Sequence, residues 1–144
     1  MIVYADTSAL VKLFIEEENS SQTRAMLGQA QAMGTGILTR AELGAALARG
    51  ARLGYISELE SLEARKRLAA VWHTWIHIVM DEKLAAVAEG LAWEHALRGY
   101  DAVHLASAVA WQKAIDAKVL LATFDQELWQ AARNAGLEIW PEDD

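Results

Sequence analysis

Short apolar runs alternate with segments of helical periodicity along the whole of this 144-residue chain. The runs that read as buried strands are residues 2–5, 35–38, 76–80, 119–123 and 137–140. Parallel strands need long crossover connections, and these are usually helices. The alternation therefore predicts an α/β fold, namely a three-layer α/β/α sandwich with a mainly parallel sheet.

Length and composition favour one domain. A chain of this size is able to bury roughly 68–70% of the surface that its unfolded form exposes. Neither an internal repeat nor a linker rich in proline, glycine or serine interrupts it. We expect a single domain over residues 1–141 and a short acidic tail at 142–144.

The chain has no cysteine, which excludes disulfides, zinc–thiolate sites and cysteine nucleophiles. No apolar stretch approaches the roughly 18 residues that a membrane span needs. The opening MIVYAD lacks the basic region and the long apolar core of a signal peptide, and it reads as a first strand. We expect a cytoplasmic protein that does not enter a membrane.

Four acidic residues stand close to the points where apolar runs give way to helix-start signals. They are Asp6 in IVYADTSAL, Glu42 in ILTRAEL, Asp101 in RGYDAVHLA and Asp125 in LLATFDQEL. We expect the three aspartates at strand-to-helix junctions and Glu42 in the first turn of a helix. Each aspartate alone is explained as a helix N-cap. Together they would lie at the edge where ligands bind in open α/β sheets.

Carboxylates that meet in a cleft repel one another unless a cation joins them. Mg²⁺ and Mn²⁺ prefer oxygen ligands, and a few carboxylates are enough to hold one or two such ions. Metal ions in such sites activate water and stabilise the leaving oxygen of a phosphodiester. The four acids are therefore candidate catalytic residues of a metal-dependent phosphodiesterase.

The net charge of −7 argues against a general nucleic-acid binder, which is normally basic. Bound cations would reverse the charge of an acidic cluster locally. Basic residues also gather in the middle of the chain, so one face is expected to be positive. Arg40, Arg49 and Arg98 are candidate phosphate contacts, with plain solvated charges as the alternative.

Six tryptophans are many for this length. Such residues stack on single-stranded RNA bases in some proteins, but more often they fill cores and protein interfaces. Trp72 and Trp75 are the candidates for a dimer or partner surface.

The blocks DTSAL, TRAEL, RGYDAVHLASA and LATFDQELWQAARNAG resemble, in this order, the PIN domain. More narrowly they resemble the VapC toxins of type II toxin–antitoxin pairs, over almost the whole chain. The resemblance implies a flavodoxin-like fold and an endoribonuclease that depends on Mg²⁺ or Mn²⁺ and hydrolyses RNA with metal-activated water. It also implies a homodimer and a cognate VapB-like antitoxin whose C-terminal segment covers the acidic groove.

The resemblance assigns roles to individual residues. Asp6 matches the first-strand metal ligand and Asp101 the central one, while Asp125 completes the acidic pocket and its metal ligands. Glu42 matches the helix-borne acid. Three residues are expected to support these acids: Ser8, Thr123 and His104. His104 has no HExxH or paired-histidine spacing around it, so we expect a supporting or packing role and not a zinc ligand.

Two other functions stay open. A phosphotransferase of the haloacid-dehalogenase type would use Asp6 as nucleophile. Such an enzyme needs a second acid two residues on, where this chain has Ser8, and a supporting lysine that no motif supplies. A non-catalytic RNA- or protein-binding module on the same fold is the other alternative, and it would not need acids at all four positions.

Overall fold

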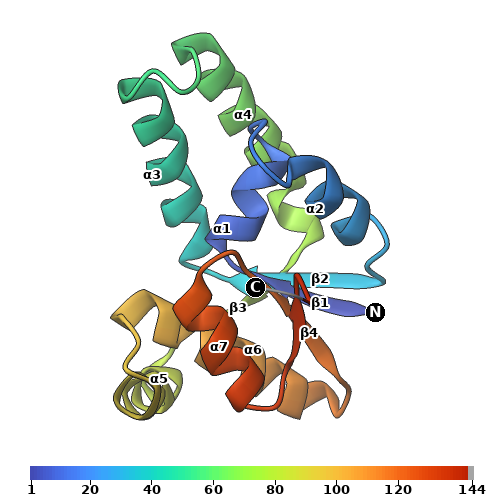
Figure 1. The fold of residues 1–144 in the computed structure, drawn as a ribbon, viewed down its shortest axis with the longest axis vertical. Helices are drawn as coiled ribbons and strands as arrows, with labels where there is room; N and C mark the ends of the chain where they lie inside the picture. The colour runs from blue at the N-terminus through green and yellow to red at the C-terminus, as the bar shows by residue number, and fades with distance from the viewer. Residues whose placement is uncertain (143–144) are drawn as a thin grey trace.

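The computed structural model describes residues 1–142, and a five-stranded sheet forms its centre (Figure 1). The strands are β1 (Ile2–Ala5), β2 (Ala32–Gly36), β3 (Ile76–Ile78), β4 (Val119–Ala122) and β5 (Glu138–Trp140). Their spatial order is β3-β2-β1-β4-β5, and all four neighbouring pairs are parallel. The predicted parallel α/β sandwich is confirmed.

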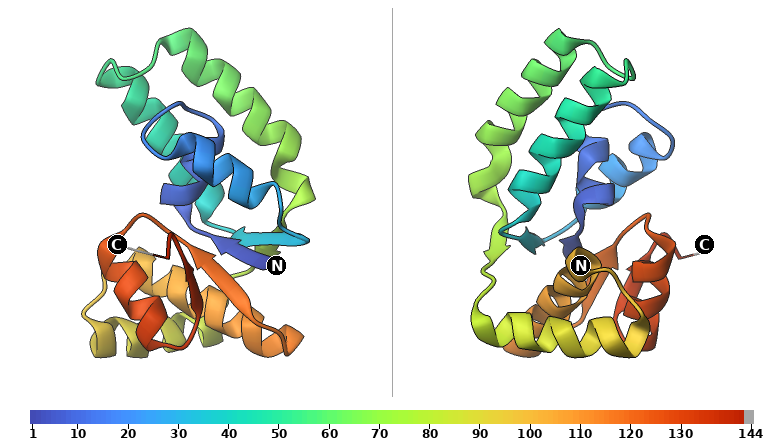
Figure 2. Two further views of the ribbon diagram at one scale, coloured as in Figure 1. Left: turned by 45° about the vertical axis from the view of Figure 1, so that its right-hand side comes forward. Right: turned by 90° about the vertical axis from the view of Figure 1, so that its left-hand side faces the viewer.

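Helices cover both faces of the sheet. They are α1 (Thr7–Leu10), α2 (Ser20–Leu27), α3 (Thr39–Arg52), α4 (Glu58–Val71), α5 (Glu82–His95), α6 (Gly99–Ile115) and α7 (Gln126–Asn134), with 3₁₀ turns η1 (Val11–Leu13) and η2 (Trp72–Thr74). Figures 1 and 2 show α1–α4 on one side of the sheet and α5–α7 on the other. None of the described helices is long and apolar enough to cross a membrane. Residues 143–144 of the expected acidic tail lie outside the described part of the chain.

The central strand β1 is buried on both faces, which explains its continuous apolar sequence. Successive side chains of a strand point to opposite faces. Tyr4 accordingly packs in the core under α5–α7, whereas Val3 and Ala5 pack in the core under α1–α4. The strand β4 pairs with β1 so that Ala5 lies opposite Ala122. The chain segments that leave these two strands therefore start side by side.

The second strand is Ala32–Gly36, so the predicted run at 35–38 was placed too late along the chain. The prediction failed because Gly34 and Gly36 are of a residue type that indicates a loop, whereas in the structure other side chains pack closely against them. A Cβ atom on Gly34 would lie only 2.7 Å from the ring of Trp111, and one on Gly36 would lie 3.1 Å from the hydroxyl of Tyr4. Glycine is therefore the residue that lets α6 pack against this strand.

The expectation for Trp72 and Trp75 was wrong. Their exposed fractions are only 6% and 9%, and the two rings pack edge to face with centroids 5.7 Å apart. Phe14 joins them in the core under α1–α4. They fill the interior and present no partner surface, whereas Trp93 on α5 is 91% exposed.

The close contact of Gly34 with Trp111 makes a stability prediction. Gly34→Ala should lower the free energy of unfolding by about 1–3 kcal/mol, because the added methyl group overpacks a buried contact. Gly90→Ala is the control. Gly90 is exposed within α5 with open space around it, so its replacement should raise that free energy by about 0.5–1 kcal/mol. Urea denaturation measures both, and equal effects would contradict the packing argument.

Candidate active site

Asp6 follows β1 directly, and its side chain is buried, with 4% of the residue exposed. Its Oδ1 accepts hydrogen bonds from the Ser8 hydroxyl (2.7 Å) and the Ala9 amide (3.0 Å). Its Oδ2 accepts one from the Thr123 hydroxyl (2.7 Å), which stands just beyond β4. Burial raises the pKa of Asp6 overall, although the charge of His104 and these hydrogen bonds act to lower it. Asp6 is thus both the N-cap of α1 and a carboxylate held at the sheet edge.

Asp125 lies two residues after Thr123 and caps α7, with its Oδ1 accepting from the Leu128 amide (2.9 Å). The hydroxyl oxygen of Thr123 accepts a hydrogen bond from the Asp125 amide (3.0 Å). Ser8 accepts one from the amide of Phe124 (2.8 Å). The two predicted hydroxyl residues therefore fix the segment after β4 to the segment after β1, and they link Asp6 to Asp125.

Glu42 lies in the first turn of α3, and His104 reaches it from α6. The Nε2 of His104 is 2.8 Å from Glu42 Oε1, and its Nδ1 is 2.8 Å from the hydroxyl of Tyr4. Burial acts to lower the pKa of His104, but the hydrogen bond to Glu42 and the charge of Asp6 raise it overall. Burial acts to raise the pKa of Glu42, but the hydrogen bond and charge of His104 lower it overall. The pair therefore favours ionised glutamate and protonated histidine.

Tyr4 was not a candidate residue in the sequence. Within a buried strand it reads as one more apolar position, and nothing in its spacing indicates a partner 100 residues away. Its side chain is fully buried, and burial raises its pKa far above the usual range. The neutral Tyr4 hydroxyl holds the second ring nitrogen of His104 and so fixes the orientation of the imidazole.

Asp101 is not at a strand-to-helix junction, so that expectation was wrong. It lies in the first turn of α6, and the chain reaches α6 from α5 through a short connection. Ala96 adopts a left-handed conformation (φ 54°) there and ends α5 without any strand following. The N-cap of α6 is Arg98, with no side-chain capping bond, so Asp101 is not a cap either.

Arg98 joins two of the acids. Its Nε lies 3.0 Å from Asp101 Oδ2, and its Nη2 lies 3.0 Å from Asp125 Oδ2. Burial and then the charge of Asp125 raise the pKa of Asp101, while Arg98 opposes them. The guanidinium side chain is 74% exposed, so solvent screens both ion pairs.

The four predicted acids are therefore linked by shared partners. Thr123 links two of them, Arg98 links two, and His104 is bonded to Glu42 and lies in the field of Asp6 and Asp101. Within residues 1–142, no group of three or more His, Cys, Asp or Glu side chains is arranged so that it could hold a metal ion. The all-oxygen donor set has the chemistry that Mg²⁺ or Mn²⁺ requires.

The other two predicted arginines lie apart. Arg40 is exposed, with its guanidinium carbon 5.7 Å from the centroid of Trp72, and Arg49 is exposed in the last turn of α3. Among the described residues, neither forms a hydrogen bond or ion pair with the four acids. Of the three candidate phosphate contacts, the structure brings only Arg98 to the site.

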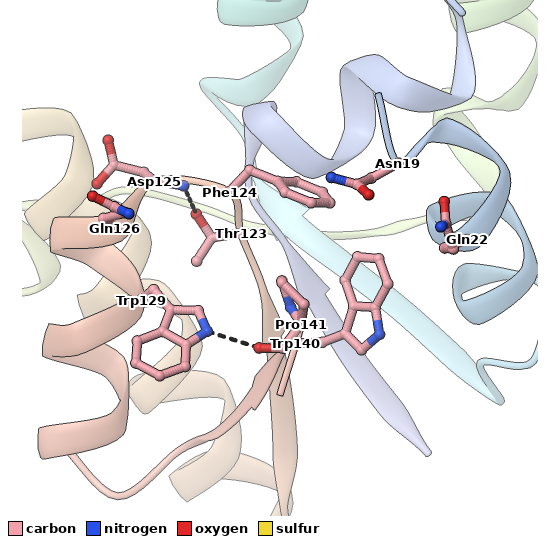
Figure 3. A pocket seen from close by; sticks show the side chains of 9 residues that line it. All are labelled: Asn19, Gln22, Thr123, Phe124, Asp125, Gln126, Trp129, Trp140 and Pro141. Atoms are coloured by element: carbon pink, nitrogen blue, oxygen red, sulfur yellow. Dashed lines mark hydrogen bonds between the residues drawn. The ribbon is translucent and has the colours of Figure 1, made fainter. Parts of the chain in front are cut away.

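A pocket of about 410 Å³ adjoins the acids and was not foreseen from the sequence (Figure 3). Its lining residues come from three distant segments, namely the start of α2, the β4–α7 junction with α7, and the end of β5. They are Asn19, Gln22, Thr123, Phe124, Asp125, Gln126, Trp129, Trp140 and Pro141. Only the fold brings these residues together.

The family model of the PIN domain matches residues 3–134. The chain belongs to the PIN-domain family. It is 36% identical over 140 residues to Ribonuclease VapC45 of Mycobacterium tuberculosis (strain CDC 1551), covering 97% of this chain and 95% of that protein. This identity confirms the resemblance to VapC proteins that the four sequence blocks carried.

Solved structures share the PIN-domain fold at low identity. VapC20 of Mycobacterium tuberculosis, a sarcin–ricin loop cleaving toxin, has a TM-score of 0.67 at 14% identity, covering 94% of this chain and 95% of that one. VapBC2 from Rickettsia felis, bound to a DNA fragment from their promoter, has a TM-score of 0.65 at 16% identity, covering 97% of this chain and 99% of that one. These likenesses extend over nearly the whole chain and concern the fold.

The Glu42–His104 pair predicts a pH dependence of stability. A histidine whose pKa is raised on folding contributes stability below its unfolded pKa of about 6.5, and this stability is lost as the pH rises through the folded pKa. The free energy of unfolding should therefore fall as the pH rises above about 6.5, by about 2 kcal/mol, the order of a hydrogen bond to a charged group. Glu42→Gln removes the main cause of the raised pKa and should flatten this fall.

Urea denaturation between pH 6 and pH 9 measures the effect. Glu138→Gln is the matched control, because Glu138 is exposed on β5 and its only ion pair within residues 1–142 is with exposed Lys118. This control should keep the slope of the parent protein. Equal slopes in the two glutamate variants would contradict the assigned coupling.

Proposed function

We propose that this PIN-domain protein is a Mg²⁺- or Mn²⁺-dependent endoribonuclease, and that it acts in the cytoplasm as the toxin of a VapBC-like type II pair. One observation carries the proposal. Four carboxyl groups are linked at one edge of the sheet, in a chain that is 36% identical to a ribonuclease over 97% of its length.

Asp6, Asp101 and Asp125 would hold the metal after their side chains have moved closer together, because within residues 1–142 they do not form a group that could hold an ion as they stand. The raised pKa values of Asp6 and Asp101 reflect burial and, for Asp101, repulsion from Asp125, and a divalent cation would relieve both. A bound ion supplies positive charge beside the phosphodiester and lowers the pKa of a water molecule. Arg98 competes for two of these carboxylates, those of Asp101 and Asp125, so it would have to release them.

The remaining residues would prepare the reaction. Glu42 is kept ionised by His104, so its carboxylate is available to take a proton from the attacking water. Ser8 and Thr123 hold the Asp6 carboxylate in a fixed orientation through their hydroxyl groups. Once released, Arg98 would be free to contact an oxygen of the RNA phosphate, as arginine commonly does.

An antitoxin would meet the same charges. The net charge of −7 and the acidic edge favour a partner segment that brings an arginine or lysine to the carboxylates. Arg98 already occupies a place of this kind between Asp101 and Asp125. The homodimer stays a prediction, now without Trp72 and Trp75 as its surface.

The phosphotransferase alternative is disfavoured by the surroundings of Asp6. Both of its carboxylate oxygens accept hydrogen bonds, and Ser8 donates one of them from the position where that enzyme class has its second acid. The nearby Lys12 is bonded to Glu17 and to the carbonyl oxygen of Glu18, not to Asp6. The first test below distinguishes an enzyme from a non-catalytic binding module.

Asp6→Asn and Asp101→Asn should each lower the rate of RNA cleavage at least about 100-fold. Asp81→Asn is the control, because Asp81 also caps a helix (α5) but is not part of the acidic cluster. Asparagine remains a good N-cap, so this control should cleave RNA like the parent. Expression of each protein without antitoxin should arrest growth only for the parent and the control. Full toxicity of the acid variants would exclude the assignment.

Mn²⁺ should stabilise the parent protein, by about 2.7 kcal/mol at a concentration about 100-fold above its dissociation constant. Mn²⁺ should stabilise the Asp101→Asn variant much less. Arg98→Gln should bind Mn²⁺ more tightly, by up to about fivefold, because a competing exposed cation is removed. Calorimetric titration and thermal melting measure these effects. Unchanged Mn²⁺ affinity in the Arg98 variant would show that the guanidinium does not compete.

A further inference from the structure

The pocket beside the acids has fixed aromatic walls. The rings of Phe124 and Trp140 meet edge to face, with centroids 5.5 Å apart and planes at 89°. The ammonium of Lys12 lies 4.3 Å from the centroid of Phe124 and holds that ring from one side. The indole nitrogen of Trp129 donates to the carbonyl oxygen of Pro141 (2.7 Å). The walls are therefore preformed, as is usual for ligand pockets.

Amide side chains stand at the same pocket. Asn19 and Gln22 both line it and are exposed, and within the described residues their side-chain amides have no hydrogen-bond partner. An amide offers both a donor and an acceptor, the combination that the edges of nucleobases require. In Figure 3 the two amides lie on the α2 side of the pocket, beyond Phe124 and Trp140.

The pocket borders the acidic site. Thr123 and Asp125 line it, and the same two residues bond to Asp6 and Arg98. A phosphodiester at the acids would therefore place the adjoining nucleotide at the mouth of this pocket. Its volume of about 410 Å³ is at the small end for ligand pockets and suits one nucleotide better than a helix of a partner protein.

We propose that this pocket binds one unpaired nucleobase of the RNA next to the cleaved bond, stacked on Phe124 or Trp140 and contacted at its edge by Asn19 and Gln22. The inference rests on the proposed ribonuclease function and adds a base-binding subsite to it. Base–aromatic stacking tolerates any base, while edge contacts discriminate among bases. The subsite therefore requires a single-stranded position in the substrate and gives it a base preference.

A positive charge beside one wall of the pocket favours an RNA strand there. Arg133 is exposed one turn after Trp129, with its guanidinium carbon 5.7 Å from that ring. It would meet a phosphate of the strand on the side away from the acids. An apolar side chain of a protein partner would use the aromatic walls but would leave the two amides and this arginine without a role.

The test measures binding separately from cleavage. In an Asp6→Asn background, which leaves the RNA uncut, short single-stranded homopolymers of A, C, G and U are titrated, and quenching of tryptophan fluorescence is followed. Phe124→Leu should weaken the best homopolymer about five- to 150-fold, the range for loss of one base–aromatic stack. Phe124→Trp keeps a stacking face and should retain more of the binding than Phe124→Leu does. Trp93→Leu, which removes a 91% exposed tryptophan of α5, is the matched control and should also bind like the parent.

Gln22→Ala and Asn19→Gly should reduce the difference in affinity among the four homopolymers while binding persists. Glycine suits the left-handed backbone of Asn19 (φ 65°), so this variant removes only the amide. Thermal melting of each variant confirms the fold.

The subsite is overturned if Phe124→Leu binds every homopolymer as tightly as Trp93→Leu. It is also overturned if Phe124→Leu leaves RNA binding intact and weakens only an antitoxin peptide, because the pocket then takes protein. Failure of the parent protein to cleave RNA with Mg²⁺ or Mn²⁺ would reject the proposed function. The homopolymer titration would still decide the subsite in that case.

Discussion

The buried carboxylate of Asp6 is the constraint on which the rest of the site depends. A charged group that is taken out of water must be met by hydrogen bonds. Here the donors are one backbone amide and two hydroxyls, and one of those hydroxyls belongs to Thr123, 117 residues further along the chain. That bond exists only because β1 and β4 are parallel neighbours in a register that places Ala5 opposite Ala122. The sheet topology therefore determines the geometry of the candidate site directly.

Two basic side chains offset the acids in different ways. His104 is buried, is fixed at both ring nitrogens by Glu42 and Tyr4, and forms a permanent part of the site. Arg98 is mostly exposed and holds its two aspartates through solvent-screened ion pairs. The half of the cluster around His104 is thus buried and paired, whereas the half around Arg98 is exposed and can exchange its cation. Metal ion, RNA and antitoxin would all have to act on that open half.

The sequence predicted the parts of this site that follow from local rules. Asp6 and Asp125 carry the N-cap pattern after apolar runs, and both stand where that pattern places them. Asp101 was misplaced because a helix follows a helix there, and a left-handed Ala96 is not a residue choice that marks such a turn. Local patterns locate single residues at junctions, but they do not reveal which element comes before the junction.

Packing accounts for the other errors. Gly34 and Gly36 of β2 are of a residue type that is common in loops. They are required here because the ring of Trp111 on α6 and the hydroxyl of Tyr4 on β1 approach this strand closely. Tyr4 and the aromatic pocket were missed for the same reason, since their partners come from distant segments.

The β4–α7 junction shows how one short segment serves two surfaces. Thr123 turns its hydroxyl to Asp6, the next residue turns a ring into the pocket, and Asp125 borders both. Ser8 holds the amide of Phe124, and Thr123 holds the amide of Asp125, so the backbone between the surfaces has little freedom to move. A ligand that fills the pocket would therefore be positioned relative to the carboxylates by the same hydrogen bonds that hold the carboxylates themselves. Specificity for a base and cleavage beside it would be coupled by this segment without any movement of its own backbone.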